Sequence, residues 1–132
     1  MPENNTKTIL IVEDDPMLSL TLSDACKEAG YNVKVANDGE EGLKIALEEK
    51  PVVILLDIMM PKMDGISVLR EIRSNLSTAE IPVIVLTNIG DVETISKIVE
   101  AGAVDYLLKS DQSVDDIIQK VKDVLARSVK LA

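Results

Sequence analysis

The 132-residue sequence contains no histidine, no tryptophan and no phenylalanine, and it has a single cysteine. Without histidine, the chain cannot form a Ser-His-Asp triad, a histidine-liganded zinc site or a histidine-based pH switch. Cys26 has no partner for an internal disulfide, which favours a reducing compartment such as the cytoplasm over secretion. Two tyrosines are the only aromatic residues, which argues against recognition of nucleic-acid bases by stacking.

Positive charge and long apolar runs are also scarce. The chain has 14 basic and 23 acidic residues and a formal net charge of −9, which disfavours broad attraction to nucleic acid or to an anionic membrane. No apolar run approaches the roughly 20 residues that a membrane-spanning helix needs. The polar start MPENNTKT lacks the apolar segment of a signal peptide. We therefore expect a cytoplasmic protein that binds neither membranes nor nucleic acid directly.

Five short segments predict the strands of a parallel sheet. Three of them are continuously apolar instead of alternating, which is typical of strands that are buried on both faces. The other two are weaker but complete a regular series along the chain. The five segments are residues 9–12, 32–36, 52–56, 83–86 and 104–108.

Each predicted strand is followed by a stretch in which apolar residues recur at helical spacing. Leu43, Ala46 and Leu47 mark the buried face of the second helix, and the fourth is marked by Val92, Ile95, Ile98 and Val99. Five strand–helix units predict an α/β fold of the flavodoxin-like (βα)5 type, with a doubly wound parallel sheet of strand order 2-1-3-4-5. We expect one domain over residues 1–132, with its core at about 8–128.

Polar residues follow four of the predicted strands, at the sheet edge where such folds bind ligands. The first strand ends in Glu13-Asp14-Asp15, and Asp57, Thr87 and Lys109 end the third, fourth and fifth. Taken singly, several have simpler explanations. Asp15 before proline is typical of a helix N-cap, Thr87 suits a strand, and Lys109 suits a solvated strand end. Asp57, directly after a buried strand, is harder to explain without a partner.

Taken together, these residue types indicate phosphoryl chemistry. Several carboxylates near one point repel each other unless a cation offsets their charge, and oxygen ligands without histidine or thiolate favour Mg²⁺. An aspartate beside a metal and a lysine can form an aspartyl-phosphate. Thr87 would then bond a phosphoryl oxygen, and Lys109 would offset the remaining negative charge.

Four motifs carry a resemblance that covers nearly the whole chain. They are IVEDDP at 11–16, LLDIMMPKMDG at 55–65, VIVLT at 83–87 and GAVDYLLKS at 102–110. With these motifs the chain resembles the receiver domain of two-component response regulators, in the short single-domain form of the bacterial chemotaxis regulators. The resemblance implies that Asp57 accepts a phosphoryl group from a histidine kinase or a phosphotransfer protein. It also implies that Asp14, Asp15 and Asp57 hold Mg²⁺ together with the backbone carbonyl of Met59.

The same resemblance implies a switch that turns phosphorylation into an altered surface. Thr87 and Lys109 would contact the phosphate, and Tyr106 matches the family's switch aromatic. Thr87 would move toward the phosphate while Tyr106 turns inward, which changes the face formed by the fourth helix, the fifth strand and the fifth helix. The signal would then pass to an output protein, and slow autodephosphorylation would end it.

The chain departs from the family pattern at two places. Ser110 follows Lys109, where the family usually has a proline with a cis peptide bond. Asn88 and Ile89 follow Thr87, where the family prefers a very small residue next to the threonine. A larger group there is expected to narrow access to Asp57 and to alter how quickly the phosphate is lost.

Two other functions use some of the same features. A metal-dependent phosphohydrolase with an aspartyl-phosphate intermediate would need a second aspartate two residues after the nucleophile, where this chain has Met59. A receiver-like module that binds partners independently of phosphorylation would tolerate both Ser110 and Asn88. We expect the signalling switch, which is not an enzyme beyond its own phosphorylation and dephosphorylation, because all of the core chemical residues are present.

Overall fold

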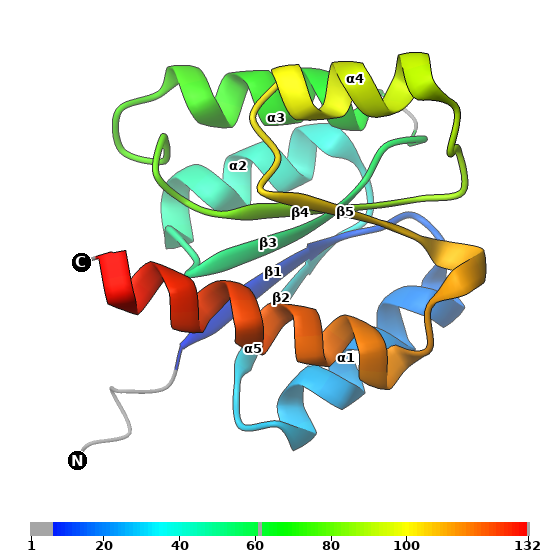
Figure 1. Ribbon diagram of the computed structural model, residues 1–132. Helices are drawn as coiled ribbons and strands as arrows, with labels where there is room; N and C mark the ends of the chain where they lie inside the picture. Colours follow the sequence, from blue (N-terminus) through cyan, green and yellow to red (C-terminus); the bar gives the residue numbers. More distant parts are fainter. Residues whose placement is uncertain (1–6, 61, 132) are drawn as a thin grey trace.

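A computed structural model describes residues 7–60 and 62–131, and it confirms the predicted α/β fold. Five parallel strands form one sheet in the order β2-β1-β3-β4-β5 (Figure 1). This order is the one that the sequence predicts, and it places β3 at the centre, beside the first strand of the chain. The strands are β1 (Thr8–Val12), β2 (Asn32–Ala36), β3 (Val53–Asp57), β4 (Val83–Thr87) and β5 (Asp105–Leu108).

Helices cover both faces of the sheet. α2, α3 and α4 lie on one face, and α1 and α5 lie on the other (Figure 1). Four of the helices begin after an aspartate whose carboxylate accepts a backbone N–H of the first turn. The helices are α1 (Pro16–Glu28), α2 (Gly39–Glu49), α3 (Gly65–Ser74), α4 (Val92–Glu100) and α5 (Val114–Leu131), and a short 3₁₀ turn η2 (Lys109–Asp111) follows β5.

The core consists of two aliphatic layers, one on each side of the sheet. Every residue of β3 and β4 is buried, and alternate side chains enter opposite layers. This double burial explains why these strands are continuously apolar in the sequence. In α2 the buried face consists of Gly39, Gly42 and Ala46, whereas Leu43 and Leu47 are only half-buried. Small residues let this helix lie close to the sheet.

The exposure of α4 differs from the expectation drawn from its spacing. Ile98 is fully buried and Ile95 is half-buried, but Val92 is 80% exposed and Val99 is 57% exposed. Successive residues turn about 100° around a helix, so Val92 and Val99 lie about 120° and about 100° away from Ile98. α4 packs beside the edge strand β5, so only one side of its apolar stripe meets the core. The other side forms an apolar surface.

Arg73 joins α3 to two neighbouring segments through backbone carbonyls. Its Nε and Nη2 atoms donate to the carbonyl oxygen of Gly102 at 3.0 and 2.8 Å. Its Nη1 atom donates to the carbonyl oxygens of Ile81 at 2.6 Å and Ala79 at 3.2 Å. The half-buried guanidinium therefore anchors the turn after α4 to the end of α3.

No helix within residues 7–60 and 62–131 has both the length and the apolar character needed to cross a bilayer. Residues 1–6, most of the polar start noted in the sequence, lie outside the described residues.

Candidate functional site

The register of the sheet brings acidic residues together at the carboxyl ends of β1 and β3. Val12 pairs with Leu56 across these neighbouring strands, so the residues that follow them, Glu13 and Asp57, lie side by side. Both residues are buried, with 1% and 5% of their surface exposed. Two buried carboxylates next to each other require cationic partners.

Lys109 supplies one of these partners from the end of β5. Its Nζ atom lies 2.8 Å from Oε1 of Glu13 and 3.3 Å from Oδ2 of Asp57. Burial alone would lower the pKa of Lys109, but the hydrogen bond and charge of Glu13 and Asp57 raise it. Lys109 is therefore a cation at neutral pH that joins the ends of three strands.

Asp57 is the carboxyl group most altered by these surroundings. Burial, and then the charge of Glu13, raise its pKa to about 6. Lys109 and the backbone N–H of Met59, which donates to Oδ1 at 3.3 Å, act in the opposite direction. Burial and the charge of Glu13 together therefore outweigh the opposing effects of Lys109 and Met59 on the pKa of Asp57.

Asp14 adds a third carboxylate at the open side of this cluster. Oxygen atoms of Glu13, Asp14 and Asp57 lie within 4.8 Å of one another, an arrangement that could hold a metal ion. Apart from its ion pair with Lys109, Oε1 of Glu13 has no hydrogen-bond partner in the described part of the chain. Three carboxylates facing one ammonium leave an excess of two negative charges, which matches a divalent cation.

Asp15 lies outside this group of carboxylates. It is exposed and forms the N-cap of α1, where its Oδ1 accepts the N–H of Met17 at 3.0 Å. Its own backbone N–H donates to Oε2 of Glu13 at 3.1 Å. Glu13, which was not among the metal ligands expected from the sequence, therefore occupies the place beside Asp57. The signal for it was its position directly after the buried Val12.

Thr87 and Tyr106 lie on the two strands next to this cluster. Thr87 ends β4, is 1% exposed, and its Oγ1 accepts the N–H of Ile89 at 3.0 Å. Tyr106 lies two register positions earlier on β5, which is an edge strand, and is half-buried against the layer of α2, α3 and α4. Thr87 therefore contacts the segment before α4, and Tyr106 packs on the face of the sheet that α4 covers.

The two departures from the family pattern have different structural outcomes. The described residues contain no cis peptide bond, and Lys109 nevertheless reaches Glu13 and Asp57 with Ser110 following it. Asn88 is exposed, whereas Ile89 is half-buried and faces the site.

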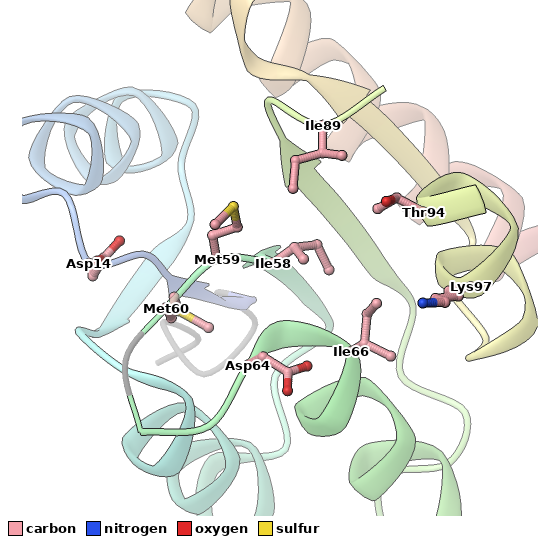
Figure 2. A pocket seen from close by; sticks show the side chains of 9 residues that line it. All are labelled: Asp14, Ile58, Met59, Met60, Asp64, Ile66, Ile89, Thr94 and Lys97. Carbon is pink, nitrogen blue, oxygen red and sulfur yellow. The ribbon is translucent and has the colours of Figure 1, made fainter. Parts of the chain in front are cut away.

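A cleft of about 530 Å³ opens beside the carboxylates (Figure 2). Ile89 projects into it from the segment before α4, and Ile66 projects from α3 on the opposite side. Met59, which is 65% exposed, and Asp14 also line it. The remaining lining residues are Ile58, Met60, Asp64, Thr94 and Lys97. The cleft beside Asp14 is therefore partly apolar.

Comparison with known proteins gives a consistent match. Residues 9–122 match the family described as response regulator receiver domain. The solved structure of a CheY-like response regulator receiver domain protein from Methanospirillum hungatei superposes with a TM-score of 0.91 at 27% identity, over 97% of this chain and all of that one.

Two longer relatives share the same region. The DNA-binding dual master transcriptional regulator RpaA of Synechocystis is 37% identical over 93% of this chain and 51% of its own length. The probable C4-dicarboxylate response regulator DctR of Bacillus subtilis is 45% identical over 76% of this chain and 45% of its own length. The chain spans about half the length of the curated relatives it matches.

Proposed function

The chain belongs to the family of response regulator receiver domains, and we propose that it works as a phosphorylation-activated switch whose phosphoacceptor is Asp57. The donor is a histidine kinase or a phosphotransfer protein, since this chain has no histidine of its own. The observation that carries the proposal is the position of Lys109, whose ammonium lies 2.8 Å from Glu13 and 3.3 Å from Asp57.

The reaction needs one ionised oxygen of Asp57. This oxygen attacks the phosphorus of the donor, so that an O–P bond forms while the N–P bond of the phosphohistidine breaks and its electron pair stays on nitrogen. With a pKa of about 6, Asp57 is mostly ionised at neutral pH. Lys109 stabilises the charge that the phosphoryl group brings into the site.

The residues present fit a Mg²⁺ ion. Glu13, Asp14 and Asp57 would hold it together with the backbone carbonyl of Met59, and the three carboxylates support this assignment because their oxygen atoms lie within 4.8 Å of one another. Bound Mg²⁺ would neutralise negative charge on the transferring phosphoryl group. In this proposal Asp15 contributes as the cap of α1 and not as a ligand, because its carboxylate bonds to Met17.

Phosphorylation at this site would change the surface of the protein through Thr87 and Tyr106. The hydroxyl of Thr87, which accepts the N–H of Ile89, can turn to donate to a phosphoryl oxygen. Movement of the segment before α4 would let Tyr106 turn inward and would change the face formed by α4, β5 and α5. Val92 and Val99 are exposed on α4, and Val104 is exposed just before β5, which gives this face an apolar surface for an output protein.

The surrounding protein supports an intracellular signalling role. We propose a cytoplasmic location, which suits the free and buried Cys26.

The net charge of −9 disfavours direct DNA binding by this domain. RpaA is a DNA-binding regulator twice as long as the matched region, so DNA binding belongs to that protein and is not assigned to this chain. An apolar Met59 at the hydrolase's acid–base position argues against a phosphohydrolase.

Beryllium fluoride, a phosphoryl analogue, tests the proposal by fluorine NMR. The wild-type protein should give a bound fluoride resonance only when Mg²⁺ is present, and Asp57→Asn should give none. Asp64→Asn, at the cap of α3 and in the lining of the cleft, is the matched control and should bind as the wild type does, because asparagine also caps helices. A folded wild-type protein without a bound resonance would rule out Asp57 as phosphoacceptor.

A further inference from the structure

The first turn of α2 contacts the segment that joins β3 to α3. Gly39, the first residue of α2, is buried against Met63. A Cβ atom on Gly39 would overlap the carbonyl oxygen of Met63, and it would lie 2.8 Å from the carbonyl carbon and 2.9 Å from the Cβ of Met63. Since these are mostly backbone atoms, rotation of a side chain could not relieve the overlap. The position of Met63 therefore depends on the absence of a side chain at Gly39.

This first turn of α2 is itself held in place. The Asp38 carboxylate accepts the N–H of Glu41 at 2.9 Å, and the Glu41 carboxylate accepts the N–H of Asn37 at 2.9 Å. Lys62 makes a second contact with the turn, with its Nζ 3.5 Å from Oδ2 of Asp38. These contacts fix the conformation of the first turn of α2, against which the segment after β3 packs.

The beginning of the same segment is fixed by a second glycine. A Cβ on Gly65, the first residue of α3, would overlap the carbonyl oxygen of Asp57 and lie 2.7 Å from the Cα of Ile58. The N–H of Gly65 donates to the carbonyl oxygen of Ile58 at 2.9 Å. Met59 lies between the two contacts, and its N–H bonds to Oδ1 of Asp57.

From this geometry we infer that Gly39 is a positioning residue for the phosphoacceptor site, which sets the place of Met63 and, through it, of the Met59 backbone beside Asp57. Gly39 is not among the residues proposed to hold the phosphoryl group or the cation, and it acts through its backbone contact with Met63. The inference rests on the proposed function, since its effect is read at the proposed cation site.

Gly39→Ala in the full chain tests this role. Helix propensity alone favours alanine at this position, so a purely local effect would leave the protein as stable as before or more so. Displacement of Met63 should instead weaken Mg²⁺ binding by about tenfold, measured by isothermal titration calorimetry, as is typical for residues that support metal ligands. The amide resonance of Met59 should shift in the metal-free protein.

Gly30→Ala is the matched control. Gly30 has φ +100, so alanine is strained there, but a Cβ would meet nothing within 4 Å. This variant should lower the melting temperature and leave Mg²⁺ affinity unchanged. Equal losses of affinity in the two variants would overturn the inference, because they would reflect general destabilisation. A folded Gly39→Ala protein with wild-type Mg²⁺ affinity would also overturn it.

A second pair of variants decides the question if Gly39→Ala does not fold. Asp38→Ala and Asp91→Ala each remove one negative charge and one helix N-cap, at α2 and at α4. Asp38→Ala should weaken Mg²⁺ binding and Asp91→Ala should not; equal affinities would overturn the inference. If the wild-type protein itself binds no Mg²⁺, the proposed cation site is wrong and the inference falls with it. Wild-type binding with unaffected variants contradicts the inference alone.

Discussion

The Nζ atom of Lys109 lies 2.8 Å from Oε1 of Glu13, although the two residues are far apart in the sequence. This ion pair joins the end of β5 to the end of β1, past the ends of β3 and β4, which lie between them in the sheet. It orients the ammonium toward Asp57, and it leaves the site with more negative than positive charge. The chemistry of the site follows from this imbalance.

The place of Glu13 in the cation site can be separated from that of Asp15. Glu13→Gln should weaken Mg²⁺ binding by about tenfold in titration calorimetry, because it removes a ligand charge beside Asp57. Asp15→Asn is the matched control and should bind Mg²⁺ as the wild type does, since asparagine also caps α1. A larger loss in Asp15→Asn than in Glu13→Gln would restore the assignment made from the sequence.

Removing the charge of Asp57 should stabilise the metal-free protein. Its pKa rises from 3.8 to about 6 on folding, mainly through burial, so the folded state binds the proton more tightly than the unfolded state. Stability contributed by this group is therefore present below about pH 4 and is lost as the pH rises through about 6. Asp57→Asn should gain at most about 3 kcal/mol at pH 7, measured by urea denaturation with a chelator.

The pH dependence of this gain is its control. The gain should disappear near pH 4, where Asp57 is protonated in both states. Asp64→Asn should not gain stability at pH 7, because hydrogen bonds from Ser67 lower the pKa of Asp64 in the folded state. A gain in Asp57→Asn that does not change between pH 4 and pH 7 would contradict the electrostatic cause.

Replacement of Lys109 should lower the free energy of unfolding when Mg²⁺ is absent. Lys109→Met leaves two buried carboxylates without their cation, and breaking a buried ion pair in this way costs about 3 kcal/mol or more. Addition of Mg²⁺ should restore part of the loss in thermal or urea unfolding. Lys120→Met is the control: its ion pair with Asp105 at 2.9 Å is partly exposed, and its removal should cost less than about 1 kcal/mol. Equal losses in both variants would contradict the described site.

Arg73 should contribute to the stability of the α3–α4 side of the protein. Arg73→Met leaves the carbonyl oxygens of Gly102 and Ile81 without their donor, at a cost of about 2 kcal/mol in urea unfolding. Arg70→Met, an exposed position on the same helix, should change stability by less than about 0.5 kcal/mol. If both variants unfold at the same urea concentration, the guanidinium does not anchor the turn.

The fold could be predicted from the sequence because the central strands are buried on both faces and read as continuous apolar runs. Strand order and the location of the ligand edge then followed from general rules of parallel α/β sheets. The same rules brought Asp57, Thr87 and Lys109 to the strand ends where the structure places them. These features depend on local pattern and on topology, which a single sequence contains.

Features that depend on register or on long-range contact could not be read in this way. Whether Glu13 or Asp15 lies beside Asp57 depends on the pairing of Val12 with Leu56. The proline after Asp15 already indicated that Asp15 caps a helix. The contact of Gly39 with Met63 joins the start of α2 to the segment before α3 and has no periodic signal in the sequence. The exposure of Val92 on α4 depends on how the helix sits over the sheet edge.

The most direct measurement is to map the phosphorylated residue after incubation with acetyl phosphate. Acid-quenched protein is digested and its peptides are analysed by mass spectrometry, with Mg²⁺ or with a chelator. The account predicts one phosphoryl group on Asp57, formed with Mg²⁺ and absent both with the chelator and in Asp57→Asn. An unmodified Asp57 in the presence of Mg²⁺, or equal labelling with the chelator, would contradict it.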